Sequence, residues 1–175
     1  TMDNAHDPKE DLSSAYLMYA HGNQFIAAGL DAQEQGFDAI VLATLGSPML
    51  QEIRSLIDIP VVGYGDVSFR LAALYGRRFG LMFFNTVREG FWREYFRING
   101  LSESFGGIAP AGVTFQDGVA AHADERRRDE VIRTIRATGE RMVNELGINV
   151  IVPGEIPLNL LLANAKVASI AGATV

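Results

Sequence analysis

Residues 36–48 decide the fold class, and they read GFDAIVLATLGSP. Within this stretch, 38–43 is a short apolar run with branched side chains, which is typical of a strand buried on both faces of a parallel sheet. A turn of small residues follows it and ends at Pro48. Ser47 can cap the next helix, and Pro48 can occupy its first position, where the missing N–H costs nothing. The stretch therefore predicts a buried strand, a tight turn and a helix.

The same unit recurs along the chain. Helical spacing of apolar residues and capping residues predict helices at 17–35, 48–57, 66–75, from 85 onward, 124–145 and 158–164. Short apolar runs predict strands at 38–43, 59–63, 78–84, near 111–115 and at 148–152. Alternation of strand, turn and helix is typical of parallel sheets covered by helices, so the sequence predicts an α/β fold.

Composition narrows the possible functions. The chain has 175 residues, a net charge of −6 and no cysteine, which excludes disulfides, cysteine-ligated metals and thiol nucleophiles within it. The acidic balance argues against nucleic acid as a partner. No apolar run approaches the roughly 18 residues of a membrane span and the start of the chain is polar, so we expect a cytoplasmic protein without a membrane partner. His6, His21 and His122 lack metal-ligand spacing, and no motif indicates a cofactor; we expect neither metal nor cofactor.

Two distant stretches share one outline. Residues 37–48 and 148–157 each contain a polar residue, a strand with branched apolar side chains, a turn of small residues and a proline at the start of a helix. In α/β sheets, ligands bind at the carboxyl ends of the strands, where turn amides and helix N-termini favour an anion. The two turns could therefore hold a carboxylate between them. They could equally be plain connections, as in any α/β protein.

The chain resembles the aspartate/glutamate racemase superfamily, and its hydantoin racemase and arylmalonate decarboxylase branch most closely. The resemblance is carried by residues 36–48, 58–66, 71–79 and 147–155. It implies two pseudo-symmetric Rossmann-like lobes with an active site in the cleft between them. We expect a first lobe at 1–76, a second at 77–166, and a return towards the first lobe at 167–175. It also implies that an N-terminal strand and a closing C-terminal helix of the family are missing from this chain.

Both catalytic cysteines of the resembled racemases are absent. Thr44 and Glu155 stand where the family's two strands end in cysteine, so a two-thiol racemase mechanism is excluded. At the end of an apolar strand, burial is expected to raise the pKa of Glu155 towards neutrality, as general acid/base chemistry requires. Glu155 could also bind substrate, or only favour the N-terminus of a helix. Thr44 has no adjacent base, so its hydroxyl is expected to hydrogen-bond a substrate oxygen or to pack at the strand end.

Further candidate site residues surround the strand ends. The turns and the end of the third strand supply the expected substrate-binding residues, which are Leu45, Gly46, Ser47, Asn85, Thr86, Gly154 and Ile156. Capping of a helix is the alternative role of Ser47, Asn85 and Thr86. Asp66 matches a position that is acidic in hydantoin racemases, although we favour a helix N-cap and a pair with Arg70 as its roles.

The leading functional hypothesis is a cofactor-independent isomerase, racemase-like or epimerase-like, or a lyase. It would act on the carbon next to a carboxylate or imide, with Glu155 and Thr44 as the catalytic pair. The alternatives are a non-catalytic binder of small anions and a hydrolase of a cyclic amide. A homo-oligomer is also expected, because aromatic residues at i, i+1, i+4 and i+5 of one helix indicate core or a subunit contact; they are Phe91, Trp92, Tyr95 and Phe96.

Overall fold

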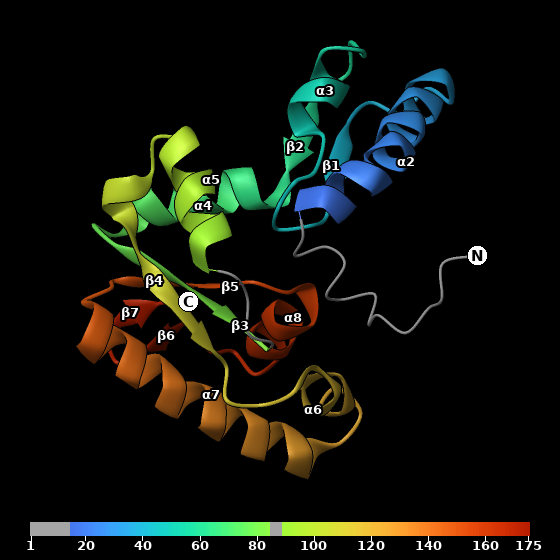
Figure 1. Ribbon diagram of the computed structural model, residues 1–175. Helices are drawn as coiled ribbons and strands as arrows, with labels where there is room; N and C mark the ends of the chain where they lie inside the picture. Colours follow the sequence, from blue (N-terminus) through green and yellow to red (C-terminus); the bar gives the residue numbers. More distant parts are fainter. Residues whose placement is uncertain (1–14, 85–88) are drawn as a thin grey trace. The chain divides into compact units, whose positions relative to one another are not determined.

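The computed structural model describes residues 15–84 and 89–175, with side chains from residue 19 onward. The chain divides into two compact units, one up to Val67 and one from Ser68 to Val175. The division falls inside one helix, α4 (Tyr64–Tyr75), earlier than the lobe boundary expected after residue 76. Figure 1 labels the helices and strands of each unit.

The first unit is built around a small parallel sheet. Its two strands are β1 (Ile40–Leu42) and β2 (Val61–Gly63), in register with Ile40 opposite Val61. Helices α2 (Ala15–Glu34) and α3 (Leu50–Arg54) pack against this pair, and Gly36 ends α2 in a left-handed conformation at φ 79°, as its sequence position predicts. The core is apolar, with Ile53 only 1% exposed. Both strands predicted for this region are confirmed.

Two helix starts in the first unit differ from prediction. α3 begins at Leu50 with Met49 as its N-cap in a left-handed conformation, and no side chain caps it. Ser47 also has a positive φ of 43°, and its hydroxyl donates back to the Thr44 carbonyl at 3.4 Å instead of receiving a helix amide. α4 begins at Tyr64, directly after β2, so Asp66 lies in its first turn and is not the expected N-cap.

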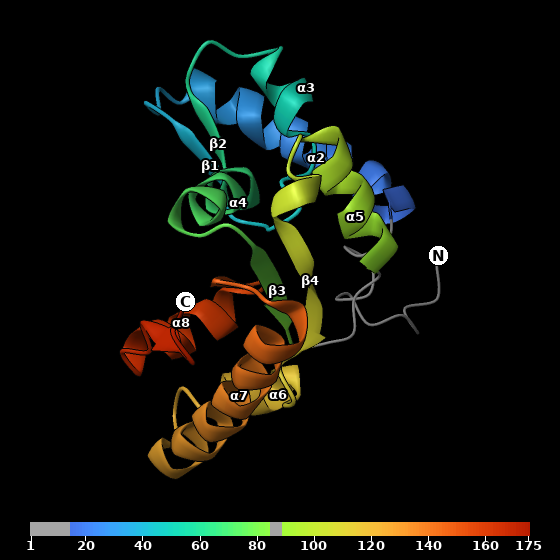
Figure 2. The same ribbon diagram turned by 90° about the vertical axis from the view of Figure 1, so that its left-hand side faces the viewer.

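The second unit is a five-stranded sheet with the order β4-β3-β5-β7-β6. The strands are β3 (Phe79–Phe83), β4 (Phe105–Pro110), β5 (Val150–Pro153), β6 (Ser169–Ile170) and β7 (Ala173–Thr174). All neighbours run parallel except β6 and β7; Figure 2 shows β3 and β4 side by side. Residues 169–174, expected to return towards the first lobe, thus complete the sheet of the second unit.

Helices cover both faces of the second sheet. They are α5 (Glu89–Ile98), α6 (Phe115–Ala120), α7 (Glu125–Leu146) and α8 (Ile156–Asn164), with a short 3-10 turn, η1 (Ser102–Ser104). Alternation along β3 sends Phe79 into an aromatic cluster with Phe96 of α5, and Met82 into a core formed with α7 and α8. Trp92 and Phe96 are buried, so these two aromatic residues of α5 belong to the core. No helix in the described part of the chain is both long enough and apolar enough to cross a bilayer.

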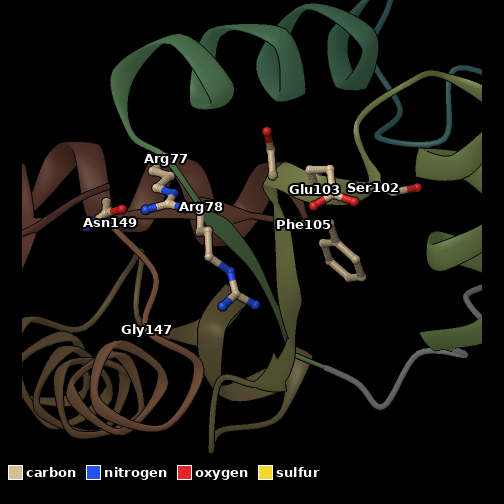
Figure 3. A pocket seen from close by; sticks show the side chains of 8 residues that line it. Arg77, Arg78, Ser102, Glu103, Phe105, Gly147 and Asn149 are labelled. Atoms are coloured by element: carbon tan, nitrogen blue, oxygen red, sulfur yellow. The ribbon is translucent and has the colours of Figure 1, made fainter.

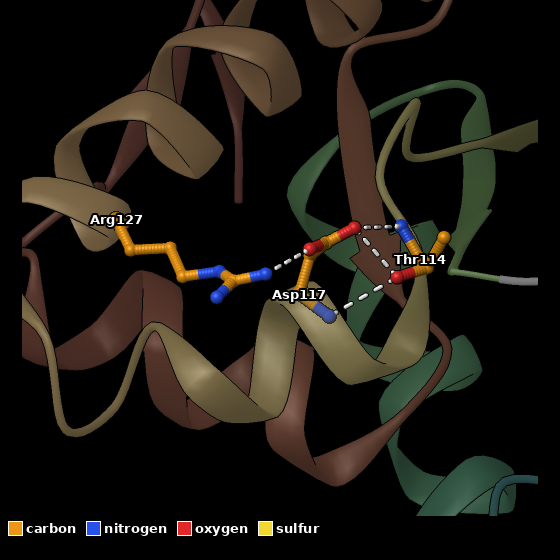
Figure 4. Close-up of polar contacts among 3 residues, drawn as sticks. All are labelled: Thr114, Asp117 and Arg127. Carbon is orange, nitrogen blue, oxygen red and sulfur yellow. Dashed lines mark hydrogen bonds and ion pairs between the residues drawn. The ribbon is translucent and has the colours of Figure 1, made fainter.

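The strand predicted near 111–115 is wrong. β4 occupies 105–110 instead, and its two glycines hide it from an apolar pattern. Thr114 begins α6 through a capping box: its hydroxyl accepts from the Asp117 amide at 3.1 Å, and the Asp117 carboxylate accepts from the Thr114 amide. Arg127 of α7 donates to the same carboxylate at 2.7 Å (Figure 4). The hydrogen bond from the Thr114 side chain, and then that from Arg127, lower the pKa of Asp117 below its ordinary value.

Candidate functional site

The first candidate half-site is the turn after β1, residues 43–49. The Ser47 amide donates to the Thr44 carbonyl at 3.1 Å, which closes the turn. Ser47 and Met49, on either side of Pro48, both have a left-handed backbone, a conformation that costs non-glycine residues of the order of 1 kcal/mol or more. The turn is therefore strained, and the packing around it must hold it in place.

Glycines of the next strand and helix provide that packing. A Cβ on Gly63 would lie 2.6 Å from the Ser47 hydroxyl oxygen, and a Cβ on Gly65 would overlap the Leu45 carbonyl oxygen. At Gly65 the chain thus approaches the backbone after β1 too closely for a side chain, whereas Gly63 packs against the side chain of Ser47. Arg54 adds a further restraint, because its Nε donates to the Val61 carbonyl at 3.0 Å and its Nη2 lies 3.8 Å from the Asp66 carboxylate.

Thr44 holds the one orphan hydroxyl found among the buried side-chain polar atoms of the described residues. Its Oγ1 is inaccessible to solvent and has no hydrogen-bond partner. Leaving a buried hydroxyl unsatisfied costs about 1 to 3 kcal/mol, and such groups are typically found where a ligand or water supplies the partner. A buried hydroxyl without a partner is compatible with a hydrogen bond to a ligand oxygen and with plain packing at the strand end, so the role of Thr44 stays a prediction.

The second candidate half-site is the end of β5 in the other unit. Glu155 is the N-cap residue of α8 but does not cap it with its side chain. Instead its Oε2 accepts a hydrogen bond from the Phe84 amide at 2.6 Å, just beyond the end of β3. Glu155 is half-buried. The carboxylate is thus fixed at the carboxyl ends of two interior strands, which is where parallel α/β sheets bind their ligands.

The other described residues that were expected to bind substrate lie at these two turns, and they differ in exposure. Leu45 and Ser47 are buried, Gly154 is buried, and Ile156 is 41% exposed. The Gly154 amide donates to the Met82 carbonyl at 2.7 Å, and the Ser47 amide is used inside its own turn. Both amides therefore already have backbone partners, and the expectation that the two turns hold an anion stays a prediction.

Asn85 and Thr86, also expected to bind substrate, lie outside the described residues. From the two similar turns we also expect the side chains of Thr44 and Glu155 to lie about 6 to 10 Å apart, with room for one small substrate between them. The two residues belong to different units, and this distance stays a prediction. Among the residues that the structure describes, no group of three histidine, aspartate or glutamate side chains is arranged to hold a metal ion.

Two features of the site go beyond what sequence reasoning predicts. The Phe84 amide as partner of Glu155 could not be inferred, because the two residues are far apart in sequence and only the pairing of β3 with β5 brings them together. The strained turn does have a signal in the sequence: glycine at both 63 and 65, at the end of a buried strand, indicates close approach of another backbone.

Parallel sheets flanked by helices, with a polar side chain at a strand end in each unit, define an α/β protein. In this class, small ligands typically bind at the carboxyl edge of the sheet. The Asp/Glu/Hydantoin racemase family model matches residues 9–166. The chain therefore belongs to the Asp/Glu/hydantoin racemase family. No curated protein matches its sequence significantly.

Solved structures support the fold. The chain is similar to an allantoin racemase from Klebsiella pneumoniae, with a TM-score of 0.67 and 19% identity over 87% of this chain and 62% of the other. An allantoin racemase from Pseudomonas fluorescens is similar with a TM-score of 0.66 and 17% identity, over 87% of this chain and 63% of the other. Escherichia coli glutamate racemase, solved with L-glutamate and the activator UDP-MurNAc-ala, is similar with a TM-score of 0.56 and 18% identity. The similarity covers 98% of this chain and 64% of the other. The chain thus spans less than two thirds of the length of these proteins.

Proposed function

We propose that this protein is a cofactor-independent isomerase, racemase-like or epimerase-like, or a lyase, acting on the carbon next to a carboxylate or imide. The observation that carries the proposal is Glu155, a half-buried carboxylate fixed at the carboxyl ends of β3 and β5 in a chain of the racemase family. The two-lobed arrangement, with both turns facing one cleft, belongs to the same proposal. An amino-acid-like substrate fits the family, and assembly into a homo-oligomer is part of the proposal.

In the proposed reaction, the C–H bond next to the carbonyl breaks and its proton passes to the Glu155 carboxylate. The electron pair moves into the carbonyl, and the resulting enolate oxygen is held by the Thr44 hydroxyl together with the Leu45 and Gly46 amides. Return of the proton restores the C–H bond, with either configuration for an isomerase. In a lyase the pair comes from the bond to a departing carboxylate, released as carbon dioxide, and Glu155 begins the reaction protonated and gives its proton to the carbon.

A non-catalytic binder of small anions is the second candidate. It is favoured by the hydrogen bond from the Phe84 amide to Glu155, because this bond gives the carboxylate a structural purpose that needs no chemistry. The orphan Thr44 hydroxyl would serve a binder equally well. The two candidates therefore differ in what happens to the α-proton of a bound ligand.

Exchange of that proton in D₂O tests the proposal. We expect loss of the α-proton NMR signal of at least one probe among L-glutamate, L-aspartate, allantoin and a 5-substituted hydantoin. Glu155→Gln keeps an oxygen for the Phe84 amide but cannot transfer the proton, so exchange should slow by about 10² to 10⁴. Iodoacetamide should have no effect, because the chain has no thiol.

The outcomes separate the candidates. Binding without exchange supports the binder, and ring opening of the hydantoin or allantoin supports a hydrolase of cyclic amides. Full exchange by Glu155→Gln, with an unchanged pH profile, contradicts the assignment of Glu155 as the acid/base.

A further inference from the structure

A depression lies at the amino edge of the second sheet, where β3, β4 and β5 begin. It has a volume of about 820 Å³ and is lined by Arg77, Arg78, Ser102, Glu103, Ser104, Phe105, Gly147 and Asn149 (Figure 3). Because these three strands run parallel, their amino ends are at the opposite edge of the sheet from Glu155. The depression is therefore separate from the candidate site, and all its residues belong to the second unit.

A break in the pairing of β3 with β4 forms one side of this depression. Phe79 is opposite Phe105, but Gly80 is opposite Gly107, so Gly106 is an extra residue in β4. Gly107 has a φ of 146°, which favours glycine. Bulges of this kind redirect the chain at sheet edges and next to binding sites. In this chain the bulge follows η1 directly, the turn that carries Ser102, Glu103 and Ser104.

The sheet also fixes the opposite side. The Asn149 amide donates to the Arg78 carbonyl at 2.8 Å, and the Thr174 amide donates to the Asn149 carbonyl at 2.9 Å. A Cβ on Gly76 would lie 2.7 Å from the Cβ of Asn149, so the backbone just before Arg77 packs directly on Asn149. The backbone that presents the two arginines and Asn149 is therefore held in place before any ligand binds.

The charged groups of the depression are unpaired. Within the described part of the chain, no hydrogen bond or ion pair is formed by the side chains of Arg77, Arg78 or Glu103, although all three line the same hollow. Arg97 on α5 behaves differently, because it makes two bonds of 2.7 Å to Glu94. Two adjacent unpaired guanidinium groups repel each other and attract an oxyanion, which they can bind in a bidentate manner.

We propose that this depression binds a small ligand carrying a phosphate or carboxylate group. Arg77 and Arg78 hold the oxyanion, and the side-chain amide of Asn149 donates to it from the side. The hydroxyls of Ser102 and Ser104 contact the rest of the ligand, and Glu103 accepts from a hydroxyl or ammonium group on it. Figure 3 shows the arginines between Asn149 and the Ser102–Glu103 turn, an arrangement that suits a ligand with an anionic end and a donor end.

Titration of the full chain with inorganic phosphate, and separately with succinate, tests the site at constant ionic strength. We expect saturable NMR shifts at the amides of Ser104, Gly147 and Asn149, but not at Gly154, which reports on the candidate active site. Saturation by phosphate alone identifies a phosphate ligand, by succinate alone a carboxylate ligand, and by both a general oxyanion site. The test does not depend on the reaction proposed for Glu155.

Matched variants separate a site from general charge attraction. Arg77→Gln with Arg78→Gln should weaken binding about tenfold or more, the loss expected for charge-assisted hydrogen bonds. Arg77→Lys with Arg78→Lys keeps the charge but loses the bidentate geometry, so an intermediate loss is expected. Arg133→Gln removes an exposed arginine of α7 outside the depression and should leave binding unchanged. Equal weakening by Arg133→Gln and the double glutamine variant, or no saturable shift with either anion, overturns the proposal.

Discussion

The turn after β1 and the turn after β5 share a sequence outline but satisfy their polar groups differently. After β5, the Gly154 amide and the Glu155 carboxylate both have backbone partners on the β3 side. After β1, two left-handed non-glycine residues surround Pro48, and the Thr44 hydroxyl is buried without a partner. A similar order of residue types therefore produces one turn that is complete in the free protein and one that is strained and lacks a partner.

Under the proposed function, the two turns would have different roles. The Phe84 amide positions the Glu155 carboxylate through a hydrogen bond, which suits the proposed acid/base role because that role needs a fixed geometry. The turn after β1 has an unsatisfied donor, as expected of a group that binds ligand. Substitutions in each turn test this difference, and a change of pH tests a charged group outside both turns.

Gly65→Ala should cause the largest loss of stability. The new Cβ would overlap the Leu45 carbonyl, and because the obstacle is backbone, the whole turn after β1 must move. We expect unfolding to become easier by about 3 kcal/mol, at the upper end of the cost of overpacking. The matched control is Gly90→Ala in α5, where nothing lies within 4 Å and where alanine should stabilise the helix by about 0.5 to 1 kcal/mol. Denaturant titration of both variants measures the difference, and equal stabilities would refute the close packing of the two backbones.

Glu155→Ala tests the completed turn. It removes the acceptor of the Phe84 amide, and Phe84 is only 5% exposed, so an unsatisfied buried donor should cost about 2 kcal/mol. Glu155→Gln retains an acceptor oxygen and should lose much less stability. Urea midpoints of the two variants measure this difference. Equal losses would show that charge at this position, and not the hydrogen bond, stabilises the turn.

Thr44→Val should act in opposite directions on folding and binding. Removing an unsatisfied buried hydroxyl should leave the free energy of unfolding unchanged or raise it by about 1 kcal/mol, while ligand binding weakens by about 1 to 3 kcal/mol. Thr138→Val is the control, because Thr138 is buried but its hydroxyl accepts from Arg141 at 3.2 Å; that variant should be destabilised. Thermal unfolding and calorimetric titration report the two quantities. A loss of stability in Thr44→Val would mean that the hydroxyl already has a partner.

Acidification should produce the smallest effect, at the surface of the second unit. The hydrogen bond from Thr114 and the Arg127 guanidinium lower the pKa of Asp117 below its ordinary value of 3.8. A carboxyl group whose pKa is lower in the folded state stabilises the protein at pH values above its ordinary pKa. This contribution disappears as the pH falls through the lowered pKa. Melting temperatures of the native protein and Asp117→Asn should therefore differ at pH 6 and converge as the pH falls through the lowered pKa of Asp117. If the difference in melting temperature did not change with pH, the effect of Asp117 would be due to helix capping alone and not to its charge.

Strong local patterns make most elements predictable. The sequence predicts α7 within one residue at each end because Asp124 caps it, Gly147 ends it, and an apolar stripe that includes Val131 and Ile135 faces the core. β4 escapes prediction because Gly106 and Gly107 give it no apolar run. At the candidate site, the sequence locates both turns but neither the left-handed Ser47 nor the partner of Glu155, since these depend on packing between segments far apart in the chain.

The position of β3 in the interior of the second sheet has a consequence for folding during synthesis. β3 pairs with β4 on one edge soon after both have been made, but its other edge pairs with β5, which follows only after the whole of α7. Until β5 leaves the ribosome, the apolar strand that contains Leu81 has an open edge able to pair with other chains. Pairings this distant in sequence also slow folding. The second unit is therefore expected to need protection from aggregation while its chain is still growing.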